Sequence, residues 1–76
     1  MNKVRRTALR RIITEIQQLA DELESIRDEE EEYRDNMPEN MQGSEKCEKA
    51  EDAISSMSDA ADSIESAVDS MESALE

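Results

Sequence analysis

The sequence contains no histidine, phenylalanine or tryptophan, and it has a single glycine, proline, cysteine and tyrosine. Without histidine, the chain lacks the usual general base and the commonest protein ligand for transition metals. It has no glycine-rich phosphate loop, and the serines between Ser55 and Ser73 have neither a base nor a nucleophile elbow beside them. We therefore predict that the protein is not an enzyme and has no catalytic residue, metal site or cofactor.

The shortage of aromatic and turn-forming residues also restricts the fold class. β-Sandwiches and barrels need both kinds of residue, whereas a chain of 76 residues with 39% charged side chains favours long helices. Cys47 has no partner for an internal disulfide, which fits a reducing compartment. No apolar run has the length of a membrane-spanning helix or the pattern of a signal peptide. We predict a cytoplasmic helical protein that does not bind a membrane.

Basic residues are scarce, with 9 Lys and Arg against 21 Asp and Glu, for a net charge of −12. Phosphate recognition needs clustered Lys and Arg, so this balance disfavours direct binding to nucleic acid. Residues 1–14 form a local basic patch without an acid, and residues 50–76 contain acids without a base. Folding one segment against the other would neutralise the patch.

Apolar residues recur with spacings of three and four in both halves of the chain, which is typical of helices that pack against other helices. In the last 26 residues the repeat of seven is nearly regular, with alanine at 53, 60, 67 and 74. The predicted self-association seam consists of Leu9, Ile12, Ile16, Leu19, Leu23, Ile26, Tyr33, Ile54, Met57, Ala61, Ile64, Val68, Met71 and Leu75. Ile13 and Ala20 on the first helix, and the four alanines on the second, are predicted to widen it.

The first helix is predicted to span residues 4–35, the corner 36–44 and the second helix 45–75, which makes residues 1–76 a single helical-hairpin unit. Within the corner, Pro38 favours the start of a short turn and Gly43 a left-handed end. Ser44 then suits the N-cap of the second helix.

Two helices of equal length joined by a short corner should fold back antiparallel. Charge supports this orientation, because it places Arg5 and Arg6 near Glu72 and Glu76, and the lysines at 46 and 49 near the acidic run at 28–32. The widened apolar stripes suit a bundle of more than two helices. We therefore predict an all-α fold, an antiparallel, coiled-coil-like two-helix hairpin that dimerises into a four-helix bundle. A seam kept for a host protein is the alternative.

The acids of the second helix form a candidate partner face. Its members are Asp52, Asp59, Asp62, Glu65, Asp69, Glu72 and Glu76. Along a helix they are spaced about 5 Å apart, against about one charge per 1.7 Å of duplex DNA axis. Such a face is either a solvated surface that maintains solubility or an imitation of a phosphate array.

The segment Asp28–Ile54 resembles a group of short acidic proteins from phages, prophages and mobile elements of Gram-positive bacteria. The resemblance lies in Tyr33, in the corner Asn36-Met37-Pro38-Glu39 and in the step Gln42-Gly43-Ser44-Glu45, followed by an acidic Ala/Ile/Leu helix. Cys47 departs from the pattern, which has a larger or aromatic residue there. The resemblance implies a mobile-element context, in which small acidic proteins sometimes inhibit host defence nucleases.

These observations lead to two hypotheses of function. The first is a non-enzymatic protein–protein interaction module that self-associates through its heptad seams. The alternative is an acidic inhibitor, acting as a DNA mimic, of a host or competing nucleic-acid-binding protein.

Overall fold

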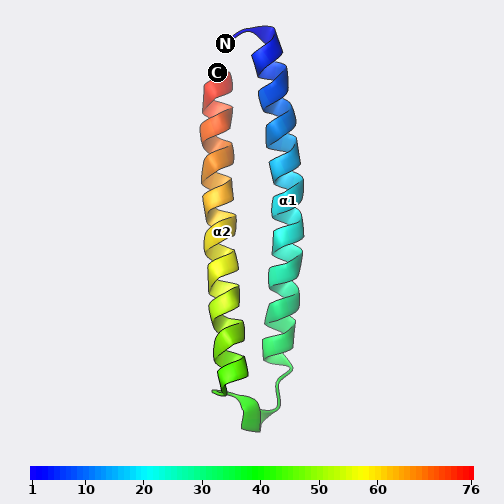
Figure 1. The fold of residues 1–76 in the computed structure, drawn as a ribbon, viewed down its shortest axis with the longest axis vertical. Helices are drawn as coiled ribbons and strands as arrows, with labels where there is room; N and C mark the ends of the chain where they lie inside the picture. Colours follow the sequence, from blue (N-terminus) through cyan, green and yellow to red (C-terminus); the bar gives the residue numbers. More distant parts are fainter.

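The computed structural model describes all residues of the chain, 1–76, as two long antiparallel helices (Figure 1). Helix α1 spans Lys3–Asp35 and helix α2 spans Glu45–Leu75, and the corner between them contains one short 3₁₀ turn, η1, at Glu39–Met41. There is no β-strand. The prediction of an all-α helical hairpin is confirmed, and α1 begins one residue before its predicted start.

Side chains that precede each long helix accept hydrogen bonds from its first turn. The Asn2 Oδ1 accepts a bond of 2.9 Å from the Arg5 amide, and the Ser44 Oγ accepts one of 3.2 Å from the Cys47 amide. These bonds satisfy amides that have no partner within the helix. Gly43 has a φ of 81°, so the corner turns into α2 through the left-handed conformation that glycine adopts most easily.

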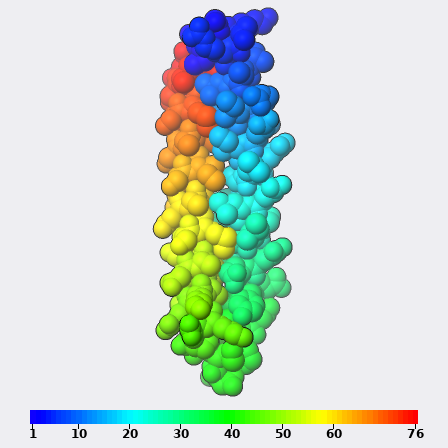
Figure 2. All heavy atoms as spheres, viewed as in Figure 1, coloured from blue at the N-terminus to red at the C-terminus, as the bar shows by residue number.

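The hairpin is a rod of 59 × 15 × 13 Å with both chain termini at the end opposite the corner (Figure 1). At that end the Arg6 guanidinium donates a hydrogen bond to the Leu75 carbonyl oxygen. The space-filling view shows the two helices in contact along most of the rod (Figure 2). Such a thin body buries little. Its buried residues are Ile13, Met37, Cys47, Ala50, Ile54 and Val68.

The second helix packs with the face that the sequence predicts. Its buried and half-buried residues include Cys47, Ala50, Ile54, Met57, Ala61, Ile64, Val68, Met71 and Leu75. All seven residues of α2 that we assigned to the seam are among them. They form the inner contact of the hairpin.

The first helix is rotated relative to the prediction. Its half-buried and buried residues include Arg6, Leu9, Ile13, Ile16, Ala20, Leu23, Arg27, Glu30 and Arg34. Of the predicted seam, Leu9, Ile16 and Leu23 face α2, whereas the residues at positions 12, 19, 26 and 33 are exposed. Ile13 and Ala20, which we placed on the flank, belong to the contact instead.

This difference in the contact within the hairpin has a geometric cause. Leu9, Ile16 and Leu23 fit two seams, one completed by the residues at 12, 19 and 26 and one by those at 13, 20 and 27. Only the second column differs, by one residue, so the centre of the face turns by about 50°, half of the ~100° between neighbouring residues. Spacing alone cannot distinguish the two seams.

Arg5 and Arg6, which the sequence predicts to lie near Glu72 and Glu76, form no ion pair with these glutamates. Each of the four ion pairs joins residues of the same helix: Arg11–Glu15, Arg27–Asp28, Arg34–Asp35 and Glu45–Lys49. Arg6 lies at an inward position and uses its guanidinium on the Leu75 carbonyl and the Met1 carbonyl. Exposed ion pairs contribute only ~0.2–1 kcal/mol, too little to redirect it.

Candidate protein-interaction surfaces

The two long sides of the hairpin differ in chemistry. On α1, Ile12 and Leu19 directly precede Ile13 and Ala20, which face α2, and both therefore lie on the same side of the helix. On α2, the alanines at 53, 60, 67 and 74 likewise directly precede the inward-facing residues at 54, 61, 68 and 75. When two helices pack antiparallel, equivalent flanking positions meet on the same side. The large residues of α1 and the alanines of α2 therefore share one surface, which we call the apolar side.

The apolar side consists of Ile12, Leu19, Ile26 and Tyr33 from α1 with Ala53, Ala60, Ala67 and Ala74 from α2. The four large residues retain 38%, 60%, 55% and 50% of their accessible surface respectively. Near the corner, Tyr33 and Ala53 line one shallow depression of about 290 Å³ together with Ala50, Glu30, Lys46 and Lys49. This shared depression places Tyr33 and Ala53 on the same surface. It also brings both lysines close to the acidic run of α1, as the sequence predicted.

Large and small side chains alternate along the apolar side. Arg6 lies level with Leu75, and Tyr33 lies beside Lys49 and Ala50. By this register Ile26 lies between the levels of Ala53 and Ala60, and Leu19 lies between those of Ala60 and Ala67. One hairpin thus presents a ridge of large residues beside a furrow of alanines.

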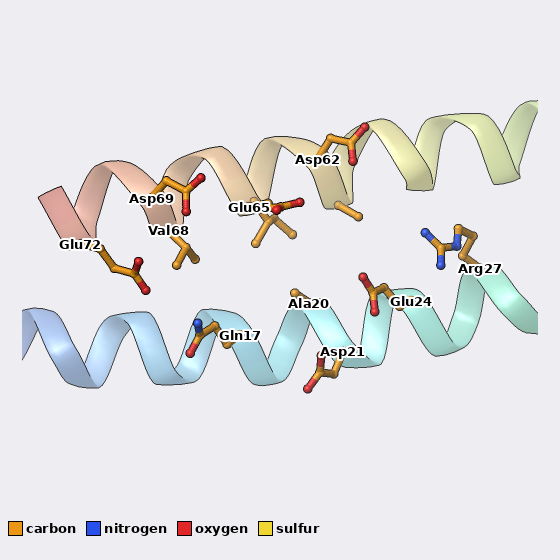
Figure 3. Close-up of a pocket in the computed structure, with 12 residues that line it drawn as sticks. Gln17, Ala20, Asp21, Glu24, Arg27, Asp62, Glu65, Val68, Asp69 and Glu72 are labelled. Atoms are coloured by element: carbon orange, nitrogen blue, oxygen red, sulfur yellow. The ribbon is translucent and has the colours of Figure 1, made fainter.

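The opposite side of the rod is acidic. There, an open groove of about 700 Å³ is lined by both helices (Figure 3). Its acidic lining residues are Asp21, Glu24, Asp62, Glu65, Asp69 and Glu72, and the lining also includes Gln17, Arg27 and Val68. In the close-up, Glu72 and Arg27 extend into the space between the helices, whereas Asp21 turns away from it (Figure 3). We call this feature the acidic groove.

The structure separates the seven acids of the predicted partner face into two sets. Asp62, Glu65, Asp69 and Glu72 line the acidic groove. The others, at positions 52, 59 and 76, are exposed and lie outside it. Sequence reasoning missed the contribution of α1, made by Asp21 and Glu24. A signal for it exists, because Glu24 follows Leu23 just as Glu65 follows Ile64 and Glu72 follows Met71.

Arg27 is an unexpected member of the inner contact. Its side chain is 26% exposed, and its Nη2 bonds the neighbouring Asp28 carboxylate at 3.3 Å. Its Nε is buried without a hydrogen-bond partner. Arg27 thus places a cation, with one unsatisfied donor, in the inner contact of the hairpin.

Cys47 is 2% exposed and packs at the start of the inner contact of α2. No group of three or more Cys, Asp and Glu side chains has the arrangement needed to hold a metal ion. Neither helix contains a stretch that is both long enough and apolar enough to cross a membrane. No known protein family, curated protein or solved structure matches the chain.

Proposed function

We propose that the protein is a non-enzymatic, cytoplasmic interaction module that forms a homodimer by packing two apolar sides against each other into a four-helix bundle. The observation that carries this proposal is the apolar side itself. Four large apolar residues at a strict interval of seven remain about half exposed in a chain that buries only six of its 76 residues. Exposed apolar patches of this continuity mark protein contacts.

The size of the chain supports the same conclusion. Small domains bury a low fraction of their surface and are marginally stable unless disulfides, metals or oligomerisation add to the core. This hairpin has one free cysteine and no metal-binding cluster. Dimerisation is then the remaining source of burial, and it would convert the apolar side into the centre of a bundle.

The test is sedimentation equilibrium of the wild-type protein and of a double variant, Leu19→Glu with Ile26→Glu. Full burial of a Leu or Ile side chain is worth about 1.5–3 kcal/mol, and about half of that remains available at each position. Each substitution acts twice in a symmetric dimer, so the double variant should lose about 3–6 kcal/mol, which is at least roughly a hundredfold in dissociation constant.

Val4→Glu is the matched control, because Val4 is 77% exposed on α1 but does not lie on the apolar side. We expect the wild type and Val4→Glu to be dimers at micromolar concentration and the double variant to be a monomer that retains its helices. A wild-type protein that stays monomeric at that concentration would refute the proposal.

The acidic groove favours a second candidate function, binding to a basic nucleic-acid-binding protein in place of DNA. Acids from both helices converge on the groove, and the chain has the strong negative charge that attracts basic surfaces. A mobile-element origin, as implied by the resemblance of Asp28–Ile54, would fit an inhibitor of host proteins.

This candidate is tested by capture from host lysate with two triple variants. The first variant changes Asp62, Glu65 and Asp69 to Lys and removes three of the six groove acids. The second changes Asp52, Asp59 and Glu76 to Lys and makes the same charge change outside the groove. A DNA mimic should lose its partner only in the first variant. Retention of the same proteins by both variants would contradict it.

Salt distinguishes the two candidates. Two copies of net charge −12 repel each other, so screening by salt should strengthen the dimer. Binding to a basic partner should weaken as salt rises, because the attraction is screened.

A further inference from the structure

We propose that the two hairpins of the dimer lie parallel, with both corners at the same end, so that α1 of each subunit packs against α2 of the partner. This inference rests on the homodimer proposed above and specifies its geometry. The alternative dimer has the corners at opposite ends, with α1 against α1 and α2 against α2.

Side-chain size favours the parallel arrangement. In it, the ridge of α1 faces the alanine furrow of the partner. The two-fold axis along the rod keeps every residue at its own level. Ile26, for example, then meets the gap between Ala53 and Ala60 of the partner subunit, and Leu19 meets the next gap. Large side chains enter spaces left by small ones, which is the knob-into-hole packing that helical bundles use. In the alternative arrangement ridge meets ridge and furrow meets furrow.

Charge at the border of the apolar side favours the same arrangement. Glu29 borders Ile26 and Tyr33 in a depression on α1, and Lys49 borders Tyr33 and Ala53 in the adjoining depression. Within one chain Lys49 pairs with Glu45, and none of the ion pairs includes Glu29. Parallel hairpins place Glu29 of each subunit about one helical turn, ~6 Å along the axis, from Lys49 of the partner subunit, within reach of the long lysine side chain, so that two symmetric pairs form.

The alternative arrangement places like charges opposite each other. The border of the apolar side on α1 contains Glu15, Glu22 and Glu29 at intervals of seven, and the corresponding border on α2 contains Lys49, Ser56, Ser63 and Ser70. If α1 packed antiparallel against α1, the middle glutamate would meet its own copy and the outer two would meet each other. In the parallel dimer the glutamates face serines and a lysine.

The parallel dimer does bring two acidic corner ends together, since residues 28–49 have a net charge of −6. Their repulsion is weakened by distance and by salt. The Debye length is ~8 Å at physiological ionic strength, and three of the acids at 28–32 lie on other sides of the helix from Glu29 and Glu30. Contacts at the border therefore decide the orientation.

A double-mutant cycle tests the border contact. Glu29→Lys and Lys49→Glu each place like charges opposite each other at two symmetric positions, and each should weaken the dimer roughly tenfold. The combined swap should restore the wild-type dissociation constant. Lys49→Glu also removes the Glu45–Lys49 pair within each chain, and the combined variant retains that loss. Circular dichroism of each variant verifies that the helices are intact.

A distance measurement tests the orientation directly. A spin label on Asn40→Cys, in a Cys47→Ala background, lies at the exposed corner. The rod is 59 Å long and 13 Å thick, so parallel hairpins place the two labels about one thickness apart and antiparallel hairpins about one length apart. Short distances together with rescue by the swap support the inference. Long distances, or a swap without rescue in a protein that is still dimeric, overturn the orientation and leave the dimer intact. If the labelled protein is monomeric, so that no dipolar coupling between two labels is seen, the dimer itself is refuted.

Discussion

Replacing Arg27 by methionine should stabilise the protein. Arg27 occupies an inward position of α1, its side chain is 26% exposed, and its Nε is buried without a partner. A buried donor left unpaired costs about 1–3 kcal/mol. Methionine keeps an unbranched side chain that reaches about as far as the Arg27 Nε, removes that donor and adds apolar surface to the contact.

The opposing effect is small. The substitution removes the Arg27–Asp28 ion pair, in which the aspartate is 65% exposed, and such pairs contribute ~0.2–1 kcal/mol. The net gain is then about 1 kcal/mol. In a domain of this size that raises the melting temperature by roughly 4–8 °C.

Arg34→Met is the matched control. Arg34 lies one heptad further along the same face, is 31% exposed and also bonds the acid that follows it. Its Nε, however, donates to the Asp35 carboxylate at 3.1 Å, so no unpaired donor is removed. Thermal and urea unfolding should be followed by circular dichroism at one fixed protein concentration, because the proposed dimer would be stabilised by mass action. If Arg27→Met is no more stable than Arg34→Met, the unpaired Nε is not the destabilising feature.

The remaining predictions concern the corner and the start of α2. Gly43→Ala should lower the free energy of unfolding, measured by urea titration, by ~1–2 kcal/mol, because alanine is strained at a φ of 81°. The added Cβ would meet no atom within 4 Å, so the backbone conformation is the only cause. Gly43→Asn should lower it less, since asparagine adopts this conformation more readily. Ser44→Ala should lower stability by ~1 kcal/mol in that titration through loss of the bond to the Cys47 amide, and Ser44→Asp should retain it. The Cys47 thiol should react with a thiol reagent only as fast as the protein opens, since the residue is 2% exposed, and fast labelling of the native protein would show that this end of the contact is loosely packed.

The sequence predicted most of the fold because its strongest signals are local. A helix is specified by its own periodicity and caps, and here Gly43 and Ser44 perform the roles that their chemistry indicated. The second helix offers only one apolar face, so its inner contact followed from spacing. The first helix offers two faces that share Leu9, Ile16 and Leu23, and the choice between them depends on contacts with α2 that periodicity does not contain.

The candidate surfaces were harder to predict for the same reason. Once α1 is rotated, Ile12, Leu19 and Ile26 move from the centre of the hairpin to its border, and their role changes from inner packing to candidate contact. The acidic groove requires Glu24 and Glu65 from different helices to lie on one side, which depends on the antiparallel register. Arg27 could not be assigned to the inner contact from a pattern that counts only apolar residues.

Self-association and binding through the acidic groove are geometrically compatible. The apolar side and the acidic groove lie on opposite sides of the plane that contains the two helices. A dimer that buries both apolar sides would therefore carry one groove on each outer surface, two-fold related and facing away from each other. Substitutions at Leu19 and Ile26 should change the number of subunits without altering either groove, whereas substitutions at Asp62 and Glu65 should alter the grooves without changing the number of subunits. The separation of the two surfaces allows each proposed function to be tested while the other is left intact.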